Sequence, residues 1–396
     1  MSSSRALASV LLLVSVSGVC CRSQEFRSCK EPSVTTASGS SVKKSSFCPG
    51  ELIFEDNFDR LNLENWQHEH TLHSRLKVPS AHGEFQYYLN SRRNSYVEDG
   101  ILYLRPTLIA DEFGEEFLKS GTISAHGGTP YDFCTNPSWN GCERTGTAEH
   151  YLNPIKSARL RTVNSFNFKY GKLEIRAKLP AGDWLWPALW LLPKLNQYGT
   201  WPISGEIDVM ESRGNLNYST PSGVQVGVEQ IESTLHFGPT AQSNAWKTST
   251  AAKHTERYNG FNKDFHLYQL EWTPEYMSFS IDGEQHLFVD GNFWERGNFE
   301  ETAPGEDNPW KSGGKMAPFD EEFYITMNLA IGGTNGFFPD PPVLNNGKPK
   351  PWLNSSPTPV KDFWEAKDEW LPTWKLDENN SKEASLQVDY VRVWAL

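Results

Sequence analysis

The feature that most constrains the fold is a strict alternation of apolar and polar residues in several short segments. Residues 170–179 read YGKLEIRAKL, in which leucine, isoleucine and alanine alternate with lysine, glutamate and arginine. This period of two predicts a β-strand with one face in the core and one in water. Residues 266–272 (HLYQLEW) and 386–394 (LQVDYVRVW) behave similarly.

The rest of the chain continues this β-rich pattern. Residues 276–289 predict a hairpin, because Asp282-Gly283 separates two alternating runs. Frequent turn residues and few helical stretches indicate an all-β fold, an antiparallel sandwich or barrel. We expect long loops at residues 106–156, 295–320 and 335–385. Long ordered loops on a β scaffold usually build a binding cleft.

The N-terminus predicts export. Residues 1–23 read as a signal peptide, since Arg5 precedes an apolar run that is too short to span a membrane. Residues 24–50, rich in Ser, Thr and Lys, are expected to form a tether, and residues 51–396 one domain. No later segment is apolar enough to span a membrane, so we expect a secreted extracellular protein. We also expect this protein to be a monomer.

The cysteines agree with an oxidising compartment. Cleavage after Ser23 leaves an even set: Cys29, Cys48, Cys134 and Cys142. Four cysteines predict two disulfides in one of three connectivities, of which the most local joins the first two and the last two. Cleavage after Gly18 would keep all six. Glycosylation sequons occur at Asn217, Asn354 and Asn379.

Composition narrows the range of partners. The net charge of −12 argues against nucleic acid and anionic membranes. The chain has 15 Trp, 14 Tyr and 22 Phe, more than core packing usually demands. This surplus suggests flat apolar surfaces for a ligand.

Residues 201–212, WPISGEIDVMES, contain three carboxylates: Glu206, Asp208 and Glu211. Hydrolysis of a glycosidic bond with retention uses two carboxyl groups roughly 5–5.5 Å apart. The pattern E-x-D-x-E would place all three acids on one face of a strand. This chain reads E-x-D-x-x-E, with one additional residue between Asp208 and Glu211. A β-bulge at Val209 or Met210 would restore the parity. The alternative is an ordinary solvated strand.

The same segment resembles the active-site strand of family-sixteen glycoside hydrolases in its bulged, laminarinase-like form. The segments DWLWPALWLLP, STLHFG, NLAIGG and VDYVRVW resemble further family motifs in the same order. The resemblance covers about residues 51–396 and is greatest to invertebrate β-1,3-glucanases and to β-1,3-glucan-binding (lipopolysaccharide- and glucan-binding) proteins. It implies a jelly-roll sandwich of two antiparallel sheets with a concave carbohydrate-binding cleft.

The resemblance implies catalytic roles for the trio, with Glu206 as nucleophile, Glu211 as acid/base and Asp208 as the auxiliary acid between them. Two nearby carboxylates cannot both ionise freely, so one acquires a raised pKa and can donate a proton. The implied reaction requires no cofactor.

Five further residues are candidates for binding sugar: Trp186, Trp190, Trp201, His236 and Arg159. Aromatic rings pack on the CH-rich faces of neutral sugars, and polar groups bind the hydroxyls. The alternatives are core tryptophans, a structural histidine and an exposed strand arginine.

Some family members hold a structural Ca²⁺. Asp389 matches one ligand position, but Asn57 stands where an acid is common, and the lost charge weakens a hard-cation site. The metal content is left open.

The sequence therefore predicts a secreted retaining endo-β-1,3-glucanase that acts on laminarin-like β-1,3-glucan. The alternative is an innate-immune recognition protein that binds microbial β-1,3-glucan or lipopolysaccharide with little or no hydrolysis. The intact trio favours hydrolysis, as does the expectation that about 27 residues between signal and domain are too few for an extra binding module. The spacing disfavours lichenase-like relatives, and the acidic composition disfavours sulfated galactans.

Overall fold

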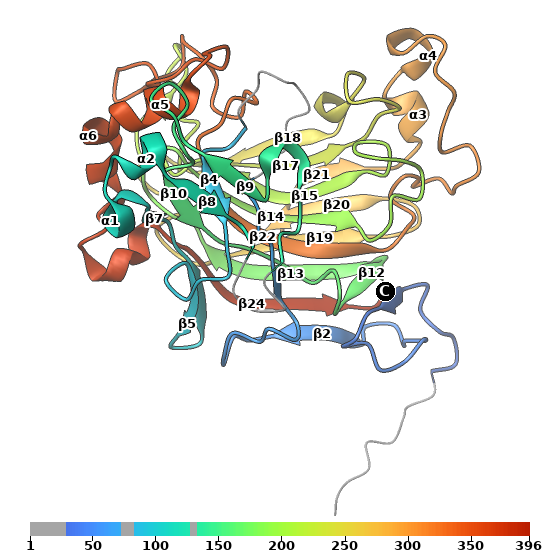
Figure 1. Cartoon of the computed structure of the whole chain (residues 1–396). Helices are drawn as coiled ribbons and strands as arrows, with labels where there is room; N and C mark the ends of the chain where they lie inside the picture. Colours follow the sequence, from blue (N-terminus) through green and yellow to red (C-terminus); the bar gives the residue numbers. More distant parts are fainter. Residues whose placement is uncertain (1–28, 73–82, 127–132) are drawn as a thin grey trace, which may run out of the picture.

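The chain forms two stacked antiparallel β-sheets (Figure 1). A computed structural model describes residues 29–72, 83–126 and 133–396. The predicted signal peptide, with Cys20 and Cys21, lies outside the described residues. Within them, no helix has the length and apolar character needed to cross a membrane.

The first sheet has nine strands, and it carries the candidate site. Its main path runs β1-β12-β22-β14-β15-β17-β18, with β11 paired to β22 and β3 paired to β11. The strands are β1 (Thr36–Ser38), β3 (Gln67–His68), β11 (Arg159–Arg161), β12 (Asn167–Lys169), β14 (Leu185–Pro193), β15 (Glu206–Ser212), β17 (Gln230–His236), β18 (Thr250–His254) and β22 (Phe323–Ile331).

The second sheet has eight strands in the order β21-β20-β19-β13-β24-β6-β5, with β2 paired to β24. They are β2 (Leu52–Asp56), β5 (Ser95–Glu98), β6 (Ile101–Leu104), β13 (Gly171–Lys178), β19 (His266–Trp272), β20 (Met277–Ile281), β21 (Glu284–Val289) and β24 (Leu386–Trp394). The antiparallel sandwich expected from the sequence is confirmed.

The alternation seen in the sequence sets the orientation of β13. Leu173, Ile175 and Ala177 are buried, whereas the charged residues between them reach the outer face. Leu173 pairs with Leu270 of β19 and with Val393 of β24, so three apolar side chains stand together on one face. The core lies between the sheets.

The predicted hairpin is β20 and β21. Asp282 and Gly283 have φ values of 52° and 81°. Both are left-handed, as a tight two-residue turn between antiparallel strands requires.

The predicted loop regions contain short helices and small sheets. In Figure 1, α1, α2, α5 and α6 gather at one end of the sandwich, and α3 and α4 at the other. The helices are α1 (Ala110–Phe113), α2 (Phe117–Ser120), α3 (Phe293–Arg296), α4 (Phe299–Thr302), α5 (Pro359–Glu365) and α6 (Lys367–Trp370), with 3₁₀ turns at Ser138–Asn140, Trp246–Thr248, Leu371–Trp374 and Asn379–Ala384. The small sheets contain β4 (Gln86–Tyr88), β7 (Thr107–Leu108) and β10 (Ile155–Ser157); β8 (Thr122–Ser124) and β9 (Glu143–Thr145); and β16 (Tyr218–Ser219) and β23 (Leu344–Asn345).

The segment expected to be a tether packs on the sandwich where the structure describes it. β1 pairs with β12 at the edge of the nine-stranded sheet, and Phe47 is buried. Disulfides join Cys29 to Cys48 and Cys134 to Cys142, which is the most local of the three connectivities. Backbone pairing and one buried ring hold this segment, although its composition is polar.

The two side chains considered for Ca²⁺ both contact arginines. Asn57 Oδ1 accepts a hydrogen bond from Arg392 Nη2 at 3.0 Å, and Asp389 forms an ion pair with Arg176. Both side chains thus already have cationic partners, which lowers the charge that they could offer to a hard cation, and calcium binding remains a prediction.

The three sequons differ in accessibility. Asn217 and Asn379 are exposed, whereas Asn354 is half-buried and its Oδ1 accepts a hydrogen bond from Lys350 Nζ at 2.5 Å. Glycosylation remains a prediction at all three.

Candidate active site

Strand β15 carries the carboxylate trio at the centre of the nine-stranded sheet. Gly205, directly before the strand, has a φ of +82°, and a Cβ there would lie 2.7 Å from the Phe319 ring. Only glycine allows this approach without strain. Ile207 and Met210 point into the core and are fully buried, while Glu206 and Asp208 face the other side.

A β-bulge solves the parity problem of the trio. Against β14, Asp208 pairs with Trp190 and Met210 pairs with Leu189, so Val209 is the residue without a partner in the ladder. Against β17, the register also shifts between Asp208 and Glu211. The extra residue at Val209 returns Glu211 to the face of Glu206 and Asp208.

All three carboxylates line one cleft with a volume of about 630 Å³. Strands β11, β14, β15, β17, β18 and β22 and several loops line it, on the face of the sheet that points away from the core. Every candidate sugar-binding residue predicted from the sequence also lines it: Arg159, Trp186, Trp190, Trp201 and His236. The structure thus brings the whole predicted site together, and the roles of its residues remain predictions.

Glu211 lies in the environment of a proton donor. Burial raises the pKa of its carboxyl group well above the ordinary value, and the charges of Glu206 and Glu232 raise it further. Trp186 Nε1 donates a hydrogen bond to Glu211 Oε1 at 2.9 Å, which favours the charged form and opposes that rise. The bond also fixes where the carboxyl group points.

Trp186 is covered on one side, unlike a free sugar platform. Its ring stacks on Phe337, with centroids 3.9 Å apart and planes 7° apart. The Arg213 guanidinium lies 4.2 Å from the centroid of Phe337, and Arg213 Nε donates to the Phe337 carbonyl at 2.8 Å. This stack of three planar groups holds Trp186 against Glu211.

His236 lies beside the other two acids. It is the cross-strand partner of Glu206, and its Nε2 is 3.3 Å from Asp208 Oδ2. On the other side of the ring, Nδ1 lies 2.8 Å from Asn244 Nδ2. The imidazole is therefore held from both nitrogens.

Two tryptophans flank His236 at this part of the cleft. The rings of Trp201 and Trp246 lie 5.8 Å and 6.2 Å from the imidazole, between centroids. Trp201 is partly exposed, and Trp246 is 37% exposed. These are the cleft tryptophans that present open ring surface, which is what a sugar face would need.

Trp190 and Arg159 belong to a buried polar cluster. Trp190 is 5% exposed, and its Nε1 donates to Asn328 Oδ1 at 2.7 Å. Arg159 is 7% exposed, so the interpretation of it as an exposed strand arginine is wrong. Its guanidinium lies 4.5 Å from the centroid of the Tyr88 ring and 5.3 Å from that of Trp190.

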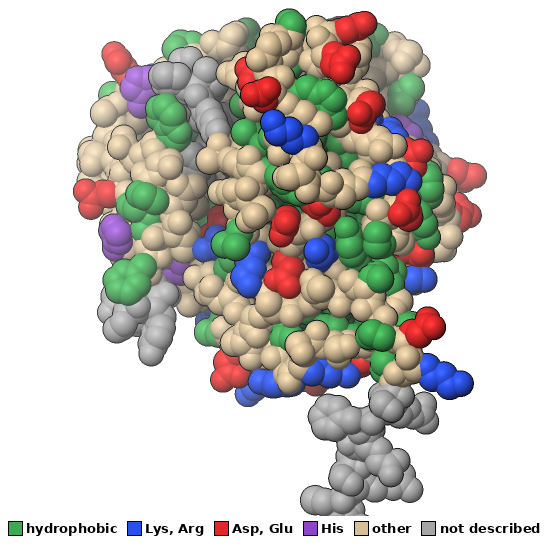
Figure 2. Space-filling model, turned by 90° about the vertical axis from the view of Figure 1, so that its right-hand side faces the viewer, with side chains coloured by type: hydrophobic (Ala, Val, Ile, Leu, Met, Phe, Trp, Pro, Cys, Tyr) green, Lys and Arg blue, Asp and Glu red, His purple; other side chains and the backbone are tan. Residues whose placement is uncertain are grey.

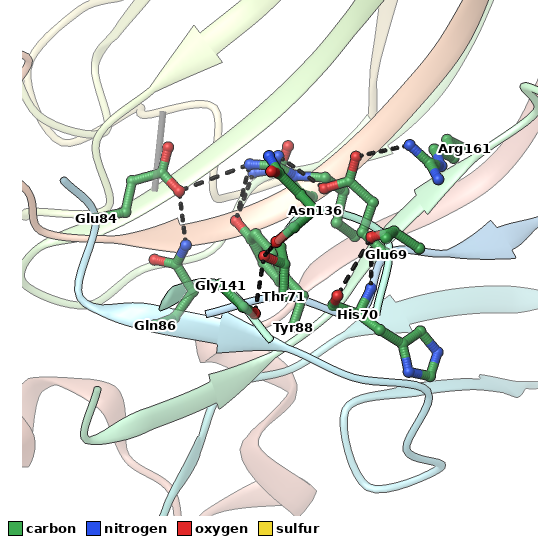
Figure 3. Close-up of polar contacts among 12 residues, drawn as sticks. Glu69, His70, Thr71, Glu84, Gln86, Tyr88, Asn136, Gly141 and Arg161 are labelled. Carbon is green, nitrogen blue, oxygen red and sulfur yellow. Dashed lines mark hydrogen bonds and ion pairs between the residues drawn. The ribbon is translucent and has the colours of Figure 1, made fainter. Parts of the chain in front are cut away.

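Two glutamates neutralise Arg159. Its distances to Glu69 and Glu84 are 3.1 Å and 3.6 Å. Figure 3 shows Glu69 and Glu84 on opposite sides of Tyr88, with Gln86 donating to Glu84. Burial without such partners would cost several kcal/mol for each charge, so the cluster accounts for a buried arginine in the cleft wall.

The loop closed by Cys134 and Cys142 is attached to this cluster. Thr71 Oγ1 donates to the carbonyls of Asn136 and Gly141, which lie next to it in Figure 3. His70 N donates to Thr135 Oγ1 at 3.0 Å. The loop closed by the second disulfide is therefore tied to the segment next to Glu69, which pairs with the cleft residue Arg159.

Sequence reasoning missed several cleft residues: Glu84, Arg213, Glu232, Asn244, Trp246 and Phe337. Most lie outside the recognised motifs, in loops that only the fold brings to the cleft. The one sequence signal for Trp246 was the surplus of aromatic residues.

Comparison with known proteins agrees with this fold. The profile of glycosyl hydrolases family 16 matches residues 134–292. A β-1,3-glucan-binding protein of Penaeus monodon is 46% identical over 87% of this chain and 90% of its own length. The chain therefore belongs to glycosyl hydrolase family 16.

Two other similarities extend beyond invertebrates. Glucan endo-1,3-β-glucosidase A1 of Niallia circulans is 32% identical over 71% of this chain and 34% of its own length. The laminarinase of Rhodothermus marinus has a TM-score of 0.50 at 23% identity, covering 87% of this chain and 97% of that one. At this identity, the structural likeness supports the shared fold.

Proposed function

We propose that the protein is a secreted retaining endo-β-1,3-glucanase. The observation that carries this proposal is the bulge at Val209, which puts Glu206, Asp208 and Glu211 on one face of β15 inside a cleft. A solvated strand would have no need to return its third acid to the face of the first two. Double displacement requires one carboxyl group that attacks and one that donates a proton, and the raised pKa of Glu211 suits the second role.

The environments of the two glutamates divide their roles. Glu211, whose pKa is raised, protonates the glycosidic oxygen while the Glu206 carboxylate attacks the anomeric carbon and forms a glycosyl-enzyme. Glu211, now ionised, then takes a proton from water, which displaces Glu206 and restores both groups. Asp208, between them in the strand and beside His236, adds to the negative charge near the reacting carbon.

The substrate class rests on the cleft surface and on relatives. Trp201 and Trp246 offer apolar ring faces, and polar groups surround them. The Niallia circulans relative is named a glucan endo-1,3-β-glucosidase. On the face shown in Figure 2, acidic and basic side chains are interspersed, so the described residues there give a sulfated polymer no continuous basic area to bind.

The second candidate is binding of β-1,3-glucan, free or on microbial surfaces, without hydrolysis. It is favoured by the name of the relative with 46% identity, a β-1,3-glucan-binding protein. An intact cleft would serve either function. The two candidate functions differ in whether the bound glucan is hydrolysed, and both require the protein to bind β-1,3-glucan.

The discriminating experiment measures new reducing ends from laminarin alongside a Glu206→Gln variant. We expect wild-type protein to release oligosaccharides, and the variant to bind laminarin but release none. A Glu232→Gln variant is the matched control, since it removes a cleft carboxylate outside the trio and should keep measurable hydrolysis. Equal, background-level release by wild type and Glu206→Gln, with laminarin still bound, would leave the binding function.

We further propose residues 51–396 as the hydrolase domain of a secreted monomer that needs no cofactor. The two disulfides agree with an oxidising compartment. Mass spectrometry of protein from a secreting host would test the cleavage site and glycosylation of the sequons. Cleavage after Gly18 would keep Cys20 and Cys21 and so change the cysteine count.

A further inference from the structure

Three side chains of the cleft have the geometry of a metal site. One potential ligand atom from each of Glu206, Asp208 and His236 lies within 4.8 Å of the other two. In the part of the chain that the structure describes, no other group of three such residues meets this condition. All three come from the adjacent strands β15 and β17, which fix their backbones rigidly.

The distance between the His236 and Asp208 ligand atoms suits a small tetrahedral ion. Zn²⁺ bonds to imidazole nitrogen and carboxylate oxygen are roughly 2.0–2.2 Å long, so two ligands of a tetrahedral ion lie roughly 3.3 Å apart. His236 Nε2 and Asp208 Oδ2 are 3.3 Å apart. A carboxylate oxygen of Glu206 completes the set of three ligand atoms within 4.8 Å of one another, and its backbone lies directly opposite that of His236.

A supporting residue for the imidazole is already in place. Asn244 lies 2.8 Å from Nδ1 of His236, and its Oδ1 is buried without a hydrogen-bond partner among the described residues. Rotating the amide exchanges its oxygen and nitrogen, so that Oδ1 accepts from Nδ1–H and Nε2 presents its lone pair to an ion. Histidines that bind metals usually donate their second N–H in this way.

We propose that Glu206, Asp208 and His236 form a binding site for a borderline divalent cation such as Zn²⁺. One nitrogen and two oxygen ligands favour Zn²⁺ over Mg²⁺ or Ca²⁺, which prefer all-oxygen sites. Two carboxylates balance the ionic charge, and the open side of the cleft leaves a position for water. A bound ion occupies the oxygens of Glu206 and therefore makes the cleft sensitive to metal.

The test is calorimetric titration of ZnCl₂ into the whole protein without any sugar, so it does not depend on hydrolysis. We expect one Zn²⁺ per chain, with MgCl₂ giving no comparable binding. His236→Ala should weaken binding at least tenfold, and Asn244→Ala roughly 10- to 100-fold. The matched control is His266→Ala, which removes another histidine beside an aspartate, 2.7 Å from Asp282, and should leave binding unchanged.

Thermal unfolding in EDTA establishes that each variant folds. If His236→Ala does not fold, Asn244→Ala and Glu206→Gln decide the matter. The visible spectrum of bound Co²⁺ should show four-coordinate geometry and lose it in His236→Ala. Absence of saturable Zn²⁺ binding, unchanged binding in the ligand variants, or equal loss in His266→Ala would overturn the proposal.

Discussion

At the residue scale, the hydrogen bond from Trp186 to Glu211 acts on the proposed proton donor. It stabilises the ionised carboxylate, while burial and two neighbouring glutamates stabilise the protonated form. Glu211 therefore stays protonated to a higher pH than an ordinary glutamate. Activity should persist while Glu211 is protonated and fall as the pH rises through its raised pKa.

Removing that hydrogen bond should move the alkaline limb of the pH profile. In Trp186→Phe, the charged form of Glu211 loses its donor, so its pKa rises further, by about one to two pH units. The pH dependence of kcat on laminarin measures this shift. A limb that moves to lower pH would mean that Trp186 does not stabilise the carboxylate.

Arg159 is expected to matter for stability. In Arg159→Met, the buried Glu69 and Glu84 lose the positive charge of Arg159. The change should therefore lower the free energy of unfolding by about 3–5 kcal/mol. Urea unfolding measures the loss. The control Arg392→Met breaks the more exposed pair with Glu55 and should cost less than about 1 kcal/mol; equal losses would contradict the account of the cluster.

Trp246 should contribute to sugar affinity through its open ring face. In a Glu206→Gln background, which prevents turnover, Trp246→Ala should weaken laminarin binding by about 1 kcal/mol. The control is Trp139→Ala, since Trp139 is 50% exposed and does not line the cleft. Calorimetry compares the two, and an equal effect of both changes would rule out a specific platform.

At the scale of elements, alternation predicted the regular strands well. Strands β19 and β24 begin and end at the predicted residues, and β13 lies within its predicted segment. Their side chains have one buried and one solvated face, so the pattern is visible locally. The bulge was also predictable. Side chains alternate along a regular strand, so the E-x-D-x-x-E spacing needs one extra residue out of register to bring all three acids to one face.

Other elements were not predictable, for physical reasons. The choice between Val209 and Met210 depended on pairing with β14, a non-local contact. Phe337 and Asn244 lie in loops whose sequences carry no period. Strand β1 was hidden in a polar segment because its stability comes from hydrogen bonds to β12.

The bulge itself can be tested by deleting Val209. The deletion creates E-x-D-x-E, which keeps three acids on one face but straightens the strand, and it removes a buried side chain at a cost of about 1–3 kcal/mol. We expect a folded protein that retains laminarin binding and loses most hydrolysis. Full activity after the deletion would show that the bend of β15 is not needed to align the two glutamates.

At the scale of the whole molecule, two sheets enclose an aromatic core and leave one face of the nine-stranded sheet for the cleft. In that core, the Trp272 ring lies 5.5 Å from both Phe168 and Phe323, between centroids. The rigid sandwich holds the trio, while loops distant in sequence bring Trp246 and Phe337 to it. This division places the carboxylate trio on a strand, and Trp246 and Phe337 in the loops between strands.

The account's central claim is that the bulged strand aligns Glu206 and Glu211 for double displacement. The most direct measurement is ¹H NMR of a laminari-oligosaccharide during the first minutes of hydrolysis, before the anomers equilibrate. The account predicts that the β-anomer of the new reducing end appears first and that Glu206→Gln produces none. Initial appearance of the α-anomer, or no cleavage by the wild-type protein, would contradict it.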